Sequence, residues 1–246
     1  MSSAGGYEPE WPMPRGVRSW QTTRAGGVSG GSFSSLNLGP HVGDDGAAVA
    51  ENRRRLRETL GLAAEPRWLE QVHGSRILRL DRGETGAADG AVTLEPGVIC
   101  AVMTADCLPV LLCDRSGTAI GVAHAGWRGL AAGVLAAAVA AMPVRSKDLL
   151  VWLGPAISQP SFEVGDEVRE AFVAADSAAA AAFAANPAGR WQADLYWLAC
   201  RQLERAGVEA VYGETTCTYR DAERFFSHRR EAPCGRMATL IWREIA

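Results

Sequence analysis

The chain has 246 residues, 48% of them hydrophobic, which is enough to bury one substantial core or at most two small ones. Its 25 Lys and Arg residues nearly balance its 28 Asp and Glu residues, so charge gives no reason to expect binding to nucleic acid or to an anionic membrane. The N-terminus lacks a secretory-signal pattern, no segment approaches the roughly 20 apolar residues that span a bilayer, and six cysteines are too few for a disulfide scaffold. We therefore expect a soluble cytoplasmic protein with reduced cysteines.

The N-terminal quarter of the chain is predicted to contain a lead-in, a loop and a helix. Residues 1–16 are rich in Gly, Ser, Glu and Pro, and we expect them to form a flexible lead-in to a single domain over residues 17–246. Residues 26–39 are a long stretch of small residues, and a loop of this length inside a domain is often functional. Asp45 offers an N-cap for a helix that runs through Leu60.

Apolar runs in the middle of the chain predict a series of strands. Two short strands flank His73-Gly74, which we expect to form a hairpin-like turn. Three longer apolar runs follow, each bounded by turn residues. The five strands are expected at Trp68–Val72, Ser75–Leu80, Val98–Met103, Leu108–Cys113 and Thr118–His124.

The second half of the chain predicts helices that alternate with strands. A helix of small and aliphatic residues over Leu130–Met142 should end at Pro143. The mixture of hairpins and crossover helices indicates one α/β or α+β domain. Further helices are expected at Gly165–Ala175 and Asp194–Ala206, and further strands at Leu149–Leu153, Val208–Tyr212 and Met237–Trp242.

Three side chains with metal-binding chemistry stand at the ends of apolar segments. His73 lies in the motif QVHG, Cys107 in TADC and His124 in AHAGWRG. Two neutral imidazoles and one thiolate suit Zn²⁺, and three protein ligands leave a fourth position for water or substrate, as in catalytic zinc sites. The three residues are far apart in the sequence, so no local spacing pattern supports the assignment.

Each of these residues also has an ordinary structural interpretation. A cysteine beside a buried strand is usually a small hydrophobic residue, and a histidine at a strand end is usually half-buried and hydrogen-bonded. For Cys100, Cys113 and Cys200, which lie in apolar periodic runs, we keep this structural interpretation.

Arginines supply a candidate anion site. Arg128 stands between Gly126 and Gly129, near the start of the predicted helix, where backbone N–H groups and a guanidinium suit a phosphate; a surface ion pair is the alternative. The segment FFSHRREAPCGR, with His228 and Arg229, fits either a second basic lip of a site or a solvated turn.

Several motifs in order along the chain closely resemble the YfiH family. That family, which includes mammalian FAMIN, has been called polyphenol oxidase or bacterial laccase, purine nucleoside phosphorylase and peptidoglycan editing factor. Two departures are visible, because Ser161-Phe162 stands where Cys-Tyr is more frequent and His228 where Tyr is frequent. The motifs, which run from about Arg18 to Trp242, are TRAGGVSGGSFSSLNLG, HVGDD, ENRRRL, LEQVHG, ADCLPVLLCD, GVAHAGWRGL, GPAISQPSFEVG, CTY and RFFSHRR…CGRMATLIW.

The resemblance implies a fold, a metal site and an activity. The fold would be a single catalytic domain, of α+β class, layered as an α-β-β-α sandwich with mixed sheets. The metal site would be zinc held by His73, Cys107 and His124. The activity would be phosphorolysis of adenosine, inosine, guanosine and methylthioadenosine, together with adenosine deamination, so that the partners are a purine nucleoside and phosphate.

Motif membership implies further roles in substrate binding. Arg128, with Arg24 or Arg53, would stabilise phosphate. Asn37 and Gln71 would hydrogen-bond ribose or base. Asp106 would either orient a zinc ligand or serve as a turn residue. The sequence assigns no role to His41 or His228.

Two other activities remain open at this point. A copper-dependent polyphenol oxidase needs many histidine ligands, and the chain has only four histidines. Peptidoglycan editing would make the protein an amidase on a muramyl nucleotide precursor that carries Ser in place of Ala. Cys107 would then be the nucleophile, with His124 or His73 as its base. A binding module without catalysis would not require this trio of ionisable residues.

Overall fold

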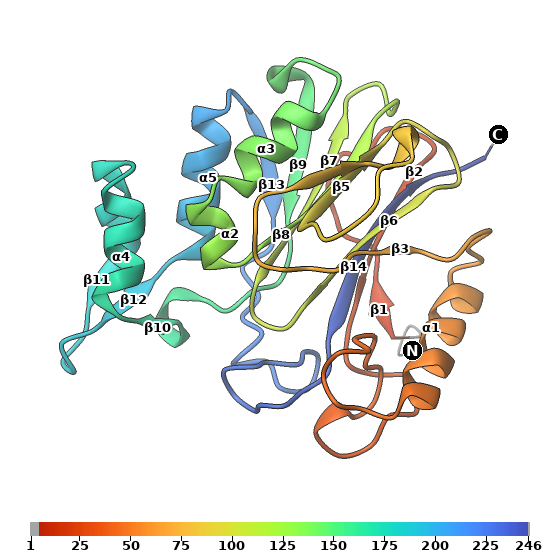
Figure 1. Cartoon of the computed structure of the whole chain (residues 1–246), viewed down its shortest axis with the longest axis horizontal. Helices are drawn as coiled ribbons and strands as arrows, with labels where there is room; N and C mark the ends of the chain where they lie inside the picture. The colour runs from red at the N-terminus through yellow and green to blue at the C-terminus, as the bar shows by residue number, and fades with distance from the viewer. Residues whose placement is uncertain (1–4, 246) are drawn as a thin grey trace.

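Two mixed β-sheets packed face to face form the centre of the protein, as a computed structural model that describes residues 5–245 shows (Figure 1). The five-stranded sheet has the order β1 (Gly6–Tyr7), β2 (Val17–Thr22), β14 (Met237–Arg243), β6 (Ile99–Thr104) and β3 (Arg67–Trp68). The six-stranded sheet has the order β13 (Ala210–Gly213), β9 (Leu149–Leu153), β7 (Leu108–Asp114), β8 (Ile120–Ala125), β5 (Gly90–Thr93) and β4 (Ile77–Arg79).

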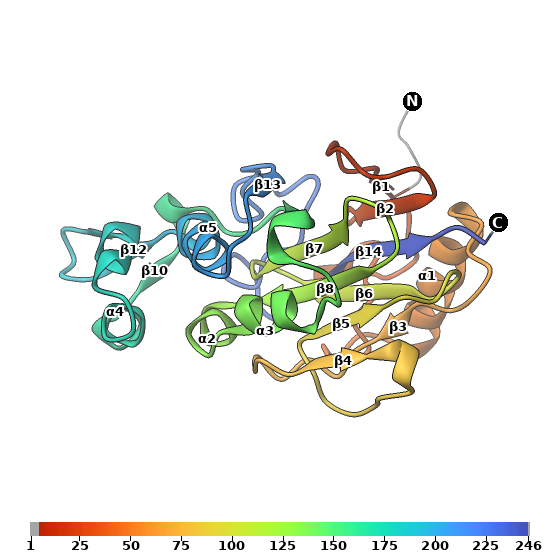
Figure 2. The same cartoon turned by 90° about the horizontal axis from the view of Figure 1, so that it is seen from above.

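Helices cover the outer face of each sheet, which gives four layers (Figure 2). Helix α1 (Gly46–Thr59) covers the five-stranded sheet, and the side chain of Asp45 caps it by accepting a hydrogen bond from the backbone N–H of Ala47, as predicted. On the other side lie α2 (Trp127–Ala131), α3 (Val134–Ala141) and α5 (Leu195–Arg205). A small lobe projects beyond them and contains α4 (Asp166–Val173) and the three-stranded sheet of β10 (Glu163–Val164), β12 (Trp191–Ala193) and β11 (Phe183–Ala185).

The alternation of side chains along each strand explains the layers. Strand β7 is apolar on both faces because both are buried: Val110 and Leu112 face the helices, whereas Leu111 and Cys113 face the other sheet. On β6, the side chain of Cys100 faces the six-stranded sheet, whereas that of the next residue, Ala101, faces α1. The predicted α+β single domain with an α-β-β-α arrangement is therefore confirmed. Among the described residues, no helix is both long and apolar enough to cross a membrane.

The predicted hairpin around His73 is wrong. Strand β3 pairs in parallel with β6 in one sheet, whereas β4 pairs in parallel with β5 in the other. The segment that contains His73 therefore carries the chain from one sheet to the other. Local sequence could not reveal this, because each short strand is paired according to the tertiary fold and not with its neighbour across the turn.

Two further expectations need adjustment. The helix predicted over Leu130–Met142 is divided into α2 and α3, because Gly133 adopts a left-handed backbone conformation with φ of 84°. In the predicted lead-in, residues 1–4 lie outside the described residues. Residues 5–16 include β1, and Trp11 and Met13 pack against the core between the sheets, so this segment is in contact with the domain.

The core between the two sheets should dominate stability. Leu111 is fully buried there, and we expect Leu111→Ala to lower the free energy of unfolding by about 2–5 kcal/mol, because it removes buried methyl groups and leaves a cavity. Ile245, which is 66% exposed, serves as the control, and Ile245→Ala should change stability by less than about 0.5 kcal/mol. Urea unfolding followed by circular dichroism measures both; equal losses would contradict this assignment of the core.

Candidate functional site

His73, Cys107 and His124 converge at one end of the six-stranded sheet. Their ligand atoms all lie within 4.8 Å of one another. The Cys107 Sγ and His73 Nε2 atoms are 3.8 Å apart, and the two imidazole ring centres are 4.7 Å apart. His124 is buried, Cys107 is half-buried and His73 is exposed, so the cluster is open to solvent on one side. The trio predicted from the sequence is thus assembled by the fold.

Strand register brings two of these residues together. Leu108 of β7 pairs with Ala125 of β8, and this places Cys107 beside Gly126. A Cβ atom added to Gly126 would lie 2.9 Å from Cys107 Sγ and 3.0 Å from His73 Cδ2. Gly126 is therefore needed for the close approach of a thiol and an imidazole, because any side chain there would displace them.

Asp89, which the sequence does not single out, connects the histidine ligands. Gly90 of β5 pairs with Ala123 of β8, so Asp89 lies beside His124, and its carboxylate accepts a hydrogen bond from His124 Nδ1 at 2.8 Å. The same carboxylate accepts the backbone N–H groups of residues 72, 73 and 74 at 3.1, 2.9 and 2.7 Å. The only local signal was an Asp-Gly pair before a short strand, which is a common turn pattern.

A second clamp holds the approach to His73. The side-chain amide of Gln71 donates to the carbonyl of Met103 and accepts from its N–H, both at 2.8 Å. It thereby extends the pairing of β3 with β6 and fixes the chain on the five-stranded sheet, while Asp89 fixes residues 72–74 on the six-stranded sheet. Between these anchors His73 has a positive φ of 59°. The turn is held from both sides.

The electrostatics of the cluster favour a thiolate beside a protonated imidazole when no metal is bound. Burial raises the pKa of Cys107, but the neighbouring His124 and His73 outweigh burial and lower it. Burial lowers the pKa of His124, but the Cys107 charge and the hydrogen bond to Asp89 raise it above its usual value. For Asp89, hydrogen bonds from His124 and the backbone outweigh the effect of burial and lower the pKa, so its carboxylate is charged.

This set of donors fits a metal ion. Zinc–ligand distances of about 2.3 Å for sulfur and about 2.0–2.1 Å for nitrogen, with tetrahedral angles, place sulfur and nitrogen about 3.6 Å apart, close to the separation of 3.8 Å between Cys107 and His73. The bond from His124 Nδ1 to Asp89 leaves Nε2 for a metal, and a carboxylate behind a ligating histidine is a common feature of metal sites. Three ligands leave a coordination position open.

A small cavity lies next to Cys107. Its volume is about 170 Å³, and its walls come from the β6–β7 turn, the starts of α2 and α5, and two loops. The basic segment that contains His228 and Arg229 forms one side, so it belongs to the rim of a cavity and is not simply a solvated turn. The lining residues are Ala105, Asp106, Cys107, Trp127, Ile157, Phe162, Leu195, His228 and Arg229.

Asp106 is hydrogen-bonded to this rim. Its carboxylate accepts hydrogen bonds from the hydroxyls of Thr218 and Ser227 and from the backbone N–H of Arg229. Of the two roles considered for Asp106, orientation of a metal ligand belongs instead to Asp89.

The other predicted site residues have these surroundings. Arg128 is exposed and lies over the Trp127 ring at 4.3 Å, and its guanidinium has no hydrogen bond or ion pair to any residue in 5–245. Arg53 donates to the carbonyl of Leu38 and lies over the Trp68 ring.

Arg24 and Asn37 are engaged within the protein. Arg24 donates to the carbonyls of Ser34 and Ala222. Asn37 is fully buried and hydrogen-bonded to Gly39, Asp44 and Arg236. Together with Gln71 they have structural roles, and their direct contact with a substrate stays a prediction.

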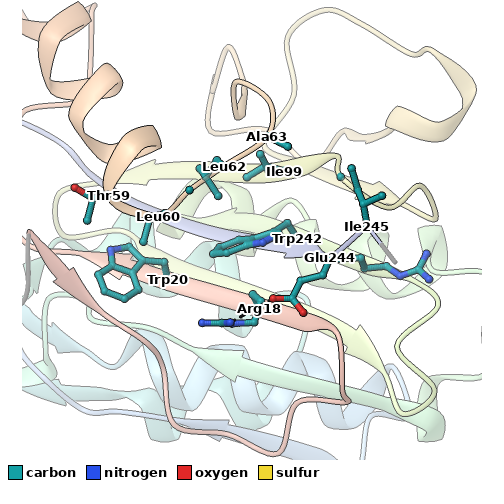
Figure 3. Close-up of a pocket in the computed structure, with 13 residues that line it drawn as sticks. Arg18, Trp20, Thr59, Leu60, Leu62, Ala63, Ile99, Trp242, Glu244 and Ile245 are labelled. Atoms are coloured by element: carbon teal, nitrogen blue, oxygen red, sulfur yellow. Dashed lines mark hydrogen bonds and ion pairs between the residues drawn. The ribbon is translucent and has the colours of Figure 1, made fainter.

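A larger cleft lies elsewhere, on the outer face of the five-stranded sheet (Figure 3). It has a volume of about 580 Å³ and is lined by the indoles of Trp20 and Trp242, with an ion pair between Arg18 and Glu244 of 3.3 Å. Its lining includes no histidine or cysteine. We place the candidate site at the smaller cavity, because among the described residues the ionisable donors converge there.

Comparison with known proteins identifies close relatives along nearly the whole chain. A family described as multi-copper polyphenol oxidoreductase laccase matches residues 18–244. A protein of Pseudomonas aeruginosa named purine nucleoside phosphorylase is 55% identical over 236 residues, which cover 95% of this chain and 96% of that protein. The protein of Escherichia coli named purine nucleoside phosphorylase YfiH is 51% identical over 237 residues, which cover 95% of this chain and 97% of that protein.

Solved structures agree with this result. A crystal structure of a Neisseria meningitidis protein is similar with a TM-score of 0.93 and 48% identity, over 98% of this chain and 100% of that chain. The crystal structure of YlmD from Geobacillus stearothermophilus has a TM-score of 0.91 and 35% identity, over 100% and 98% of the two chains.

The contact at Gly126 yields a direct test of the cluster. We expect Gly126→Ala to weaken metal binding at least about tenfold, because the new methyl group displaces the thiol and the His73 ring. Competition with a chromophoric chelator measures this. Gly46→Ala is the control, since its Cβ meets nothing within 4 Å. Unchanged affinity in Gly126→Ala would contradict the site.

The lowered pKa of Cys107 predicts selective reactivity in metal-free protein. At pH 7 Cys107 should react with iodoacetamide faster than Cys200, although Cys200 is more exposed, because burial raises the pKa of Cys200 and leaves it a thiol. The rate at Cys107 should fall as the pH is lowered through its pKa, and added zinc should protect it. Peptide mass spectrometry measures both sites, and preferential labelling of Cys200 would count against the thiolate.

Proposed function

Because the chain belongs to the YfiH family, described as multi-copper polyphenol oxidoreductase laccase, we propose that it is a zinc-dependent purine nucleoside phosphorylase with adenosine deaminase activity, located in the cytoplasm. Its substrates would be adenosine, inosine, guanosine and methylthioadenosine, with phosphate as the second substrate. The observation that carries the proposal is the cluster of His73, Cys107 and His124 beside a small cavity, in a chain whose relatives are named purine nucleoside phosphorylases.

The three ligands would hold zinc at an open coordination position. When bound, zinc would supply a Lewis acid and lower the pKa of a water molecule, which suits attack at purine C6 in the deamination. Asp89 orients His124 so that Nε2 faces the other two ligands. The positive charge of the ion would balance the thiolate of Cys107, while the two histidines would bind as neutral imidazoles.

Arginines would hold the phosphate against ribose C1′. Arg128 is the first candidate, because its guanidinium is exposed beside the cavity wall residue Trp127 and has no anionic partner in residues 5–245. Arg53 is the second: it lies close to His41, whose pKa burial, Arg236 and Arg53 all lower. The positive charges of Arg53 and Arg236 near His41 favour the binding of an anion.

The oxidase alternative is not supported by the metal-binding residues. A multicopper enzyme needs several histidine-rich centres. The chain has four histidines, and within residues 5–245 one group of His, Cys, Asp or Glu residues has the spacing of a metal site. One such group accommodates a single ion.

The cell-wall editing alternative keeps one favourable observation. The pairing of Cys107 with His124 and His73 would also activate a cysteine nucleophile for amide hydrolysis of a muramyl nucleotide precursor. Loss of metal separates the two mechanisms: a phosphorylase that depends on zinc should lose activity with a chelator, whereas a cysteine amidase should retain it.

A nucleoside assay tests the proposal. Zinc-loaded protein should release adenine from adenosine only with phosphate, and should form inosine without it. Cys107→Ala should lower both rates by about 100-fold or more, because it removes a ligand of the site, whereas Cys200→Ala, on the exposed side of α5, should have no effect. Chromatography of the products measures base and inosine separately. Identical products from Cys107→Ala and wild type would contradict the proposal.

A further inference from the structure

The cavity beside Cys107 is built from segments that are distant in the sequence. Cys107 lies in the β6–β7 turn, Ile157 follows β9, Trp127 begins α2, and Arg229 belongs to the loop before β14. The pairing of β7 with β8 fixes the segments that carry Cys107 and Trp127. The segments that carry Ile157 and Arg229 lie outside the two large sheets and are held by hydrogen bonds, among them the bridge of Ala156 to Cys217 and those of Arg230 to the carbonyls of residues 218, 219 and 225.

Asp106 ties both of these segments to the turn that carries Cys107. It is 8% exposed, and its carboxylate accepts hydrogen bonds from Thr218 Oγ1 at 2.6 Å, from Ser227 Oγ at 3.0 Å and from the backbone N–H of Arg229 at 2.7 Å. Its backbone carbonyl accepts the N–H of Ile157 at 2.9 Å. One residue therefore joins two walls of the cavity to the turn that carries Cys107. Each bond to a buried carboxylate is stronger than a bond between neutral groups.

The size and lining of the cavity favour a flat aromatic group. Its volume of about 170 Å³ is smaller than the ~300–1,000 Å³ of sites that enclose a whole drug-sized ligand. A cavity of this size suits a compact group such as a single base. Trp127 and Phe162 are aromatic wall residues on which a base can stack, and Ile157 and Leu195 are apolar.

We propose that Asp106 is a positioning residue that fixes the walls of the cavity in which the purine base binds, and that it thereby sets the affinity of the protein for the base. The inference rests on the proposed function, because that function makes a purine the ligand. Asp89 and Asp106, both buried, then have different roles. Asp89 holds the histidine ligands of the metal, whereas Asp106 holds the pocket for the substrate.

The test is the isosteric variant Asp106→Asn in zinc-loaded protein. The amide is neutral and has one acceptor oxygen, so the hydrogen bonds that the carboxylate accepts from Thr218, Ser227 and the N–H of Arg229 are weakened or reversed, and the loop with Arg229 should be held less firmly. We expect KM for adenosine and the dissociation constant of free adenine to rise roughly tenfold, with kcat and zinc content within about twofold of wild type. Calorimetry measures adenine binding, which does not depend on turnover, and metal analysis measures zinc.

Two further variants control for charge and for stability. Thr218→Val removes one hydrogen bond to Asp106 without a change of charge. It should raise KM for adenosine and the dissociation constant of adenine by a smaller factor, and it serves as the test if Asp106→Asn does not fold. Asp114→Asn is the matched structural control. Asp114 is also buried and accepts from Ser116, Thr118 and Ala119, and its loss should lower the melting temperature while KM and adenine binding stay at the wild-type values.

The outcomes distinguish this inference from the proposed function. Unchanged KM and adenine affinity in Asp106→Asn and Thr218→Val, in a wild-type protein that performs phosphorolysis, would overturn the role of Asp106 alone. Loss of zinc from Asp106→Asn would also overturn it. Adenine binding that Asp106→Asn weakens, in a wild type that releases no base from nucleosides, would support the pocket and refute the phosphorylase. A wild type that binds no adenine would overturn the inference.

Discussion

The candidate site depends on the buried carboxylate of Asp89. A charged group away from water is stable only when its oxygens are hydrogen-bonded, and Asp89 obtains its partners from the His124 imidazole and from three consecutive N–H groups of residues 72–74. Satisfying this carboxylate forces the two histidines together. One of them lies on a strand of the six-stranded sheet, and the other lies on the segment that crosses between the sheets.

The two-sheet architecture places the residues that Asp89 connects at one end of the six-stranded sheet. Strands β7, β8 and β5 are neighbours, so Cys107, His124 and Asp89 lie at the same end of one sheet. The packed sheets then place the crossing segment over that end. The absence of a side chain at Gly126 lets the thiol and the His73 ring approach closely. Strand pairing positions His124 and the turn that carries Cys107, whereas hydrogen bonds to Asp89 hold the segment that carries His73.

Predictions from the sequence succeeded where the signal was local or chemical. A long apolar run predicted β9 at the same residues that the structure has, and Asp45 correctly predicted the start of α1. The trio of His73, Cys107 and His124 was recognised because the chain has only four histidines and because all three residues stand at the ends of apolar segments. The hairpin at His73 was wrong because strand partners are chosen by the tertiary fold. Asp89 was missed because an Asp-Gly pair carries no information about what its carboxylate will contact.

Composition and pattern indicated which donors are present, that they end apolar segments, and that strands and helices combine in one α/β or α+β domain. The choice of the α+β class and of zinc rested on motifs that resemble a known family. The connections came from the tertiary structure alone. It assigned Asp89 to the histidine ligands and Asp106 to the cavity walls, although both are aspartates near the start of a strand. The physical reason is that the role of a carboxylate is set by its hydrogen-bond donors, and all the donors that Asp89 and Asp106 receive from side chains come from residues 35 or more positions away.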